Sequence, residues 1–304
     1  MRSLIFMVLF LLPQWAIAQD WKVKTVASDQ YPAEIVEENR KSAKNSVLDG
    51  LPDGLIANAI GKGDILSAWY EDPTTRYGHG ILGDAIEAGR LAVEKTDGEI
   101  VRYDLDQQSV FEDRYPRLKD LDGDGKIEIV TIKASLSDGA GVTIYGLENG
   151  AIVERATTGY HGRANRWLNI AGIANFTGED GLQVAFVRTP HIGGDLHFYR
   201  YHNGSFESID KISGFSNHVI GSREMRLSAI ADIDGNGFVD VALPSNDRKT
   251  LRMIGFREGK LLELDRVNLP SRINKAIASR GGGEDLMFTV GTSDGKVFEI
   301  TRDY

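Results

Sequence analysis

The sequence contains no cysteine, so disulfides contribute nothing to its stability, even in an oxidising compartment. Beyond the N-terminal region it has no apolar run long enough to cross a bilayer as a helix. It is also short of positive charge, because 35 Lys and Arg stand against 44 Asp and Glu and give a formal net charge of −9. This balance argues against non-specific binding to nucleic acids or to an anionic membrane surface.

The N-terminus has the pattern of an export signal. Arg2 precedes an apolar core at Leu4–Leu12, and Ala16-Ile17-Ala18 supplies small residues at a cleavage site. The apolar core is too short to span a bilayer. We therefore expect residues 1–18 to be a signal peptide and the mature chain to be periplasmic or extracellular, with no membrane insertion after cleavage. An uncleaved membrane anchor is the alternative.

An internal repeat follows in the mature chain, and such periods decide the fold. Five segments each combine a glycine-bearing turn with an apolar strand. They are "NAIGKGDILSAW" from Asn58, "DLDGDGKIEIVTI" from Asp120, "NFTGEDGLQVAFV" from Asn175, "DIDGNGFVDVAL" from Asp232 and "SRGGGEDLMFTV" from Ser279. Downstream of four of them, Asp-Gly, Asn-Gly or Glu-Gly between two alternating runs indicates a hairpin.

Each repeat therefore predicts four antiparallel strands, A to D, with the glycine-bearing turn between A and B. The fifth repeat has room for three strands only, and "DWKVKTVASD" near the N-terminus can supply the fourth. A first strand that completes the last blade closes a propeller and removes its free edges. We predict an all-β fold, a single five-bladed β-propeller over residues 19–304. A pair of β-sandwiches or a β-solenoid is the alternative, and the polar segment 32–50 is expected as a short helix or a loop.

At "DLDGDGKIEIV" and "DIDGNGFVDVAL" the chain resembles the FG-GAP/VCBS repeat family, whose repeats also build integrin head domains. The resemblance covers these two motifs and three degenerate copies. It implies a propeller with calcium bound in the A–B loops on one face, and it implies no single activity.

The two acidic loops also predict calcium from their own chemistry. Ca²⁺ takes six to eight oxygen ligands, many of them carboxylates, and a tight loop can direct alternate residues inward. The expected ligands are Asp120, Asp122, Asp124, the Lys126 carbonyl and Glu128 in one loop, and Asp232, Asp234, Asn236, the Phe238 carbonyl and Asp240 in the other. Neither loop has the Glu at position 12 that an EF-hand requires. Neither loop contains His or Cys, which disfavours zinc or copper as the bound metal. We predict two Ca²⁺ sites, and the degenerate loop at Asn175 leaves a weak third one open.

Basic residues recur on the opposite face, in the connectors between strand D of one repeat and strand A of the next. Four connectors carry a basic-x-x-basic pair: Arg114 and Arg117, Arg163 and Arg166, Arg223 and Arg226, Arg272 and Lys275. These residues, with His161 and His218 in the same connectors, form a candidate binding site for an anion. The alternative is that the cations pair with acidic neighbours such as Glu112, Asp113 and Glu224 and simply connect the blades.

Two further histidines belong to loops on this face. His79 and His191 lie between strands B and C of the first and third repeats, and Tyr77 is close to His79. Long glycine-bearing loops on a rigid scaffold are common binding sites. His79 or His191 as base and Tyr77 as acid are the catalytic candidates, although the sequence has no nucleophile elbow, zinc signature or phosphate loop.

Three functions remain open at this point. The first is an exported calcium-binding module whose basic face captures an anionic glycan or an acidic protein partner. The second is a lyase or hydrolase that acts on a polysaccharide, and the third is an envelope scaffolding protein. Fold alone does not choose among them, and the sequence leaves the oligomeric state open.

Overall fold

The computed structural model describes residues 21–31, 51 and 53–303. The predicted signal peptide and the segment 32–50 lie outside these residues. The described part is all β, with two short 3₁₀ helices, η1 (Ser28–Gln30) and η2 (Gly283–Asp285). It contains no helix that combines the length and the apolar character needed to cross a membrane.

The strands form antiparallel groups of four in the predicted A–B–C–D order. The first group is β2 (Ala57–Asn58), β3 (Ile65–Thr74), β4 (Glu87–Lys95) and β5 (Ile100–Asp104). The second is β7 (Arg117–Lys119), β8 (Glu128–Ser135), β9 (Gly139–Glu148) and β10 (Ala151–Thr157). A strand that the repeats did not predict, β6 (Ser109–Phe111), pairs with both β4 and β8 and joins the two groups into a nine-stranded sheet.

The next two groups are separate four-stranded sheets. The third consists of β11 (Leu168–Ala174), β12 (Gln183–Arg188), β13 (Asp195–His202) and β14 (Ser205–Ser213). The fourth consists of β15 (Ala229–Ala231), β16 (Asp240–Pro244), β17 (Thr250–Arg257) and β18 (Lys260–Asn268).

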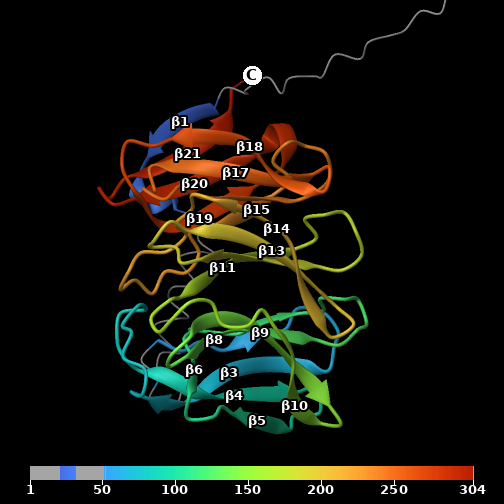
Figure 1. Cartoon of the computed structure of the whole chain (residues 1–304). Helices are drawn as coiled ribbons and strands as arrows, with labels where there is room; N and C mark the ends of the chain where they lie inside the picture. The colour runs from blue at the N-terminus through green and yellow to red at the C-terminus, as the bar shows by residue number, and fades with distance from the viewer. Residues whose placement is uncertain (1–20, 32–50, 52, 304) are drawn as a thin grey trace, which may run out of the picture.

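The last sheet combines both ends of the described chain. It consists of β19 (Ile273–Arg280), β20 (Met287–Thr292), β21 (Val297–Arg302) and β1 (Trp21–Val26). Strand β1 runs antiparallel to β21, with Trp21 opposite Arg302 and Val26 opposite Val297, and Figure 1 shows it in blue beside the red strands. The prediction that an N-terminal strand completes the last sheet is confirmed.

The hairpins follow from local turn chemistry. In three of them both central residues have positive φ, which is 49° and 79° at Asn149-Gly150, 50° and 74° at Asn203-Gly204, and 52° and 79° at Glu258-Gly259. Two consecutive positive φ angles define the type I′ turn, whose twist matches that of the flanking strands. These dipeptides therefore fix the register between strands C and D.

Buried side chains pack between consecutive groups of strands. Four apolar clusters connect the first group to the second, the second to the third, the third to the fourth and the fourth to the fifth. Representative pairs are Leu91 and Ile129, Val130 and Phe186, Val187 and Val241, and Met253 and Phe288. Within residues 21–31, 51 and 53–303 no such cluster joins the fifth group to the first. The antiparallel sheets thus pack in series (Figure 1), and the closed five-bladed ring stays a prediction.

Candidate active site

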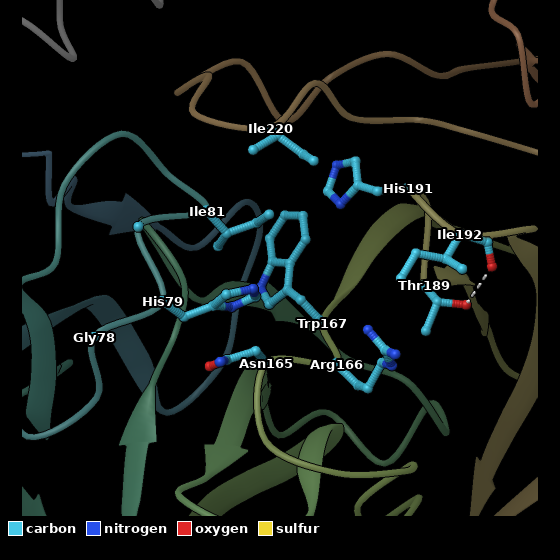
Figure 2. Close-up of a pocket in the computed structure, with 11 residues that line it drawn as sticks. Gly78, His79, Ile81, Asn165, Arg166, Trp167, Thr189, His191, Ile192 and Ile220 are labelled. Carbon is cyan, nitrogen blue, oxygen red and sulfur yellow. Dashed lines mark hydrogen bonds between the residues drawn. The ribbon is translucent and has the colours of Figure 1, made fainter.

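A cavity of about 460 Å³ lies where loops of three strand groups meet (Figure 2). One wall comes from the loop between β3 and β4, and another from the loop between β12 and β13. The connectors that precede β11 and β15 complete it. The lining residues are Gly78, His79, Gly80, Ile81, Asn165, Arg166, Trp167, Thr189, His191, Ile192 and Ile220. Three residues predicted from the sequence, His79, His191 and Arg166, therefore share one cavity.

Trp167 fixes the connector that carries Arg166. Its side chain is 3% exposed and belongs to the apolar cluster between the second and third groups. The indole N–H donates to the backbone carbonyl of Glu112 at 2.9 Å. The ring lies parallel to the His191 imidazole, with a centroid separation of 6.2 Å. Trp167 thus holds both walls of the cavity and offers part of its ring to whatever occupies it.

His79 is hydrogen-bonded to a buried carboxyl group. Its Nδ1 lies 2.5 Å from Oε1 of Glu112, whose side chain is 0% exposed and whose Oε2 has no hydrogen-bond partner in the described structure. Burial raises the pKa of Glu112 well above its usual range, while burial and the Arg166 charge lower the pKa of His79. Both shifts favour a neutral pair in which the Glu112 hydroxyl donates to Nδ1 and leaves an N–H on Nε2 of His79.

His191 belongs to a chain of hydrogen bonds with a fixed direction. His218 Nε2 lies 2.9 Å from the Ser222 carbonyl, which can only accept, so Nε2 carries the proton. Burial lowers the pKa of His218 to about 3 and that of His191 to about 4, so both rings are neutral at pH 7. Nδ1 of His218 must then accept from Nε2 of His191, 3.1 Å away. This series of hydrogen bonds leaves a free lone pair on Nδ1 of His191, at the cavity wall.

This assignment predicts the protonation of the pair. We expect ¹⁵N NMR of the folded protein to show His218 with its proton on Nε2, and neither ring becoming cationic above about pH 5, whereas an ordinary imidazole titrates near 6.5. Because the unfolded chain binds these protons first, the pair contributes folding free energy above about pH 6.5 that is lost as the pH falls towards the folded pKa values. Protonation of either ring near pH 6.5 would contradict the assignment.

Tyr77 does not line the cavity. Its hydroxyl accepts a hydrogen bond from the Asn165 backbone N–H at 2.9 Å, its side chain is buried, and burial raises its pKa. The geometry therefore gives Tyr77 a supporting role for the connector beside Arg166, and its role as the catalytic acid stays a prediction.

Four of the eight predicted basic residues contact other parts of the protein through their side chains. Two of the three acidic neighbours named from the sequence, Asp113 and Glu224, do pair with them, whereas Glu112 bonds His79 instead. The contacts are Arg117 with Asp113, Arg226 with Glu224 at 2.8 Å, Arg223 with Asp84 at 3.1 Å, and Arg114 with the Asp53 backbone carbonyl at 3.1 Å.

Arg166 differs from these residues because its guanidinium makes no ion pair with any described residue and lies at the cavity. Arg163, Arg272 and Lys275 likewise have no ion pair in the described part of the chain. His161 lies outside the cavity wall, and burial lowers its pKa. Of the predicted ring of anion-binding cations, Arg166 is the member that lines this cavity, and anion binding by Arg163, Arg272 and Lys275 stays a prediction.

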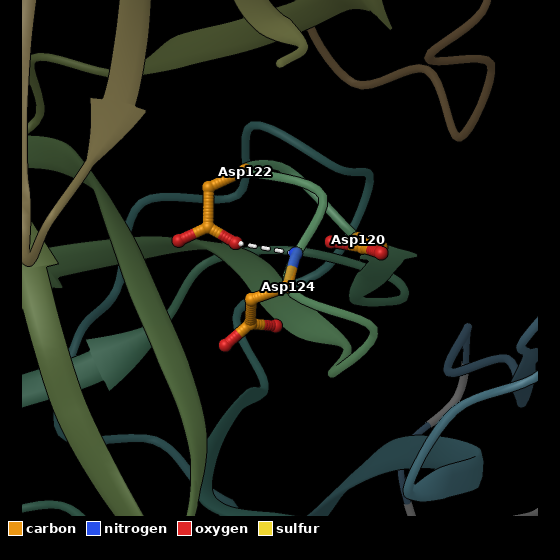
Figure 3. Close-up of side chains that lie close together, drawn as sticks. All are labelled: Asp120, Asp122 and Asp124. Carbon is orange, nitrogen blue, oxygen red and sulfur yellow. Dashed lines mark hydrogen bonds between the residues drawn. The ribbon is translucent and has the colours of Figure 1, made fainter. Parts of the chain in front are cut away.

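The acidic loops belong to a different set of turns, those between strands A and B. Ligand oxygens of Asp120, Asp122 and Asp124 lie within 4.8 Å of one another (Figure 3). The Gly123 and Gly125 N–H groups donate to Asp120 at 2.8 and 3.0 Å, and both glycines have positive φ. A tight turn of this kind aims three carboxylates at one point, a donor set that suits Ca²⁺.

The second acidic loop repeats this arrangement with one addition. Oxygens of Asp232, Asp234 and Asp240 lie within 4.8 Å of one another. Here Arg257 reaches into the cluster and donates to Asp234 at 2.7 Å and to Asp240 at 2.9 Å. The described structure gives the three aspartates of the first loop no such cation. The first loop is therefore the better cation site.

The ninth residue of each loop has a structural role. Its side-chain oxygen accepts from the N–H of the second loop residue, in the pairs Glu128 with Leu121 (2.8 Å), Gln183 with Phe176 (2.7 Å) and Asp240 with Ile233 (3.0 Å). Glu128 also pairs with Arg155 and lies outside the group of three aspartates. In the loop at Asn175 the Glu179 carboxylate pairs with Arg200 at 2.5 Å. The carbonyls of Lys126 and Phe238 and the amide of Asn236 stay predicted ligands.

Comparison with known proteins adds information on the fold. No protein-family model matches the sequence, and no curated protein matches it. Among solved structures, the Bacillus licheniformis rhamnogalacturonan lyase PL11 superposes with a TM-score of 0.51 and 18% identity, over 80% of this chain and 49% of that chain. Rhamnogalacturonan lyase YesW gives 0.50 and 18%, over the same shares of the two chains. This chain thus spans about half the length of these proteins, and the likeness concerns the fold.

Proposed function

We propose that the protein cleaves an acidic polysaccharide by β-elimination in the cavity between His79 and His191. The observation that carries the proposal is the pairing of opposite proton states there, an N–H on His79 and a free lone pair on His191, beside the guanidinium of Arg166. The fold likeness to rhamnogalacturonan lyases supports the same class of substrate, a chain that contains uronic acid.

Each group has a role in this reaction. Nδ1 of His191 takes the proton from the sugar carbon next to the carboxylate, and the electrons form a double bond as the bond to the glycosidic oxygen breaks. That oxygen takes the Nε2 proton of His79 while Glu112 passes its own proton to Nδ1. Arg166 pairs with the uronate carboxylate, which makes the proton on the neighbouring carbon more acidic. The proton gained by His191 returns through solvent to Nε2 of His79, whose Nδ1 proton passes back to the buried Glu112.

Turnover of rhamnogalacturonan tests the proposal. The double bond formed by elimination absorbs in the ultraviolet, whereas hydrolysis releases reducing ends without that absorbance. We expect absorbance to rise with rhamnogalacturonan and to stay constant with a neutral galactan. Reducing ends without new absorbance would assign the cavity to hydrolysis and remove the elimination mechanism.

Binding without turnover is the second candidate. It is favoured by the low pKa of His191, about 4, because a base is most effective when its pKa lies near the working pH. The same cavity would then hold an anionic glycan or an acidic protein segment through Arg166. Saturable binding of rhamnogalacturonan without any product would support this candidate over the enzyme.

We further propose that the scaffold is an exported five-bladed propeller of the FG-GAP/VCBS type, stabilised by calcium. The repeat order, the pairing of β1 with β21 and the two clusters of aspartates support this. A cation that binds only the folded state stabilises it.

Calcium should therefore raise the melting temperature. Saturation at about 100 times the dissociation constant corresponds to about 2.7 kcal/mol, or roughly 4–5 °C for a chain of this size, and EDTA should reverse it. Asp122→Asn should remove more of the shift than Asp234→Asn, since Arg257 already neutralises the second loop. Asp180→Asn, in the degenerate loop, is the matched control. An equal shift in all three variants would place the ion elsewhere.

A further inference from the structure

A second hollow adjoins the cavity of His79 and His191. Its volume is about 320 Å³, and it shares His191 and Ile220 with the first cavity. The remaining walls come from the third and fourth strand groups: Pro190, Gly193, Ser216, Val219, Asn246 and Arg248. The two hollows therefore adjoin at His191 and Ile220, and an extended ligand could occupy both.

Arg248 brings a positive charge to this hollow without a negative partner. Among the described residues its guanidinium makes two long contacts, from Nη1 to Oγ of Ser216 at 3.3 Å and to the His218 carbonyl at 3.5 Å. Its Nε is buried without a hydrogen-bond partner, and the described structure gives it no ion pair. The adjacent carboxylate of Asp247 instead accepts from Ser245 at 2.7 Å and from the Lys249 N–H at 3.0 Å.

The backbone of Arg248 is held firmly. Its φ is +56°, and its N–H donates to the Ser245 carbonyl at 2.8 Å while its own carbonyl accepts from Ile273 at 2.7 Å. Arg272 is close enough for its charge, after burial, to lower the pKa of Arg248. The Asp247 carboxylate acts in the opposite direction, with a smaller effect than Arg272. A guanidinium held at a fixed position without an ion pair attracts an anion.

We propose that this second hollow, the Arg248 subsite, binds the carboxylate of a second acidic sugar on the same polysaccharide chain. The proposal rests on the proposed function for its choice of ligand, and on the shared wall at His191 for its continuity with the first cavity. The protein would then recognise two acidic sugars of one chain, with the imidazoles between the two anion sites.

Occupancy of the Arg248 subsite should also affect the base. The Arg248 charge is one of the causes that lower the pKa of His191. A carboxylate bound at Arg248 would offset that charge and make His191 more basic. Substrates with two acidic sugars should therefore gain in kcat as well as in affinity.

Calorimetric titration tests the subsite with rhamnogalacturonan oligosaccharides that contain one or two galacturonate residues. The protein carries His79→Ala throughout, so that turnover does not consume the ligand. Since a hydrogen bond to a charged group contributes about 1.5–3 kcal/mol, Arg248→Gln should weaken binding of the two-acid ligand about 10–100-fold. The same substitution should leave the affinity for the one-acid ligand unchanged. Lys249→Gln, an exposed neighbour with the same change in charge, is the matched control.

Arg272→Gln is a second variant that should fold normally, because this exposed residue makes no ion pair in the described structure. It should show the same selective loss of affinity for the two-acid ligand. Equal binding of the two-acid ligand by Arg248→Gln and Lys249→Gln would overturn the subsite, and so would equal loss for both ligands. If Arg248→Gln selectively loses affinity for the two-acid ligand but the protein without substitutions turns over no rhamnogalacturonan, then the subsite is supported and the lyase activity is ruled out. If the protein turns over rhamnogalacturonan but Arg248→Gln shows no selective loss of affinity, then the lyase activity is supported and the subsite is ruled out.

Discussion

Replacement of His79 by alanine should lower kcat for elimination about 10²–10⁴-fold, the usual contribution of a positioned proton donor or base. His79 lines the cavity, and the contact between its Nδ1 and the buried Glu112 leaves the N–H on Nε2. Without the ring, the glycosidic oxygen would have to leave without a proton. Initial rates of absorbance increase with rhamnogalacturonan measure the effect.

The chain offers a matched control for this experiment. His202, at the exposed end of β13, lies outside both hollows, and His202→Ala should retain full activity. Glu112→Gln separates the two roles of the pair, because an amide can still orient His79 but has no acidic proton to pass on. A folded His79→Ala variant with unchanged kcat would rule out His79 as the proton donor.

The sequence predicts the strand order well because the fold is built from local signals. Glycine-bearing turns and Asn-Gly or Glu-Gly hairpins punctuate each repeat, so strands A to D could be assigned before their neighbours in space were known. The place of β1 followed from a missing strand in the last repeat. Strand β6 was not predicted, because Ser109–Phe111 is too short to show an alternating pattern and its partners β4 and β8 belong to two different repeats.

The candidate site was predicted only in part, and the reason is physical. Strand direction places His79, His191 and Arg166 on one face, which the repeat order alone indicates. Their proton states depend on contacts across different strand groups, such as Glu112 with His79 and Ser222 with His218. Nothing in the sequence near Glu112 shows that it would be fully buried, and adjacent Asp113 pairs with Arg117 instead.

Arg248 illustrates the same limit. It follows no basic-x-x-basic pattern, and it lies in the turn between β16 and β17, where a charged residue usually faces solvent. Only the packing of the third strand group against the fourth brings it beside His191 and leaves its Nε buried. A signal of this kind, a cation without a partner, exists only in the folded chain.

A chain that begins at Ala27, and so lacks β1, should melt about 10 °C or more below the full chain, the largest stability effect that we expect. Strand β1 pairs with β21 over six residues. Its Trp21 donates to Asp265 of the fourth group at 2.7 Å and lies under the Arg302 guanidinium, 5.2 Å from the ring centroid. Removal would cost these contacts and expose the edge of β21 to pairing with other chains. Differential scanning calorimetry measures the change.

A peptide that spans residues 20–27, added in excess to the shortened chain, should restore most of the lost melting temperature, because an exposed sheet edge accepts a matching strand. The matched control is the same peptide with Lys24→Pro, which removes one N–H from the strand and disfavours its extended pairing. If the shortened chain melts with the full one, or if both peptides rescue it equally, then β1 is not what completes the fifth sheet in solution. Rescue by the unmodified peptide alone would instead mean that the fifth sheet needs its fourth strand from the opposite end of the chain. A closed circle of blades requires the last blade to be completed in this way.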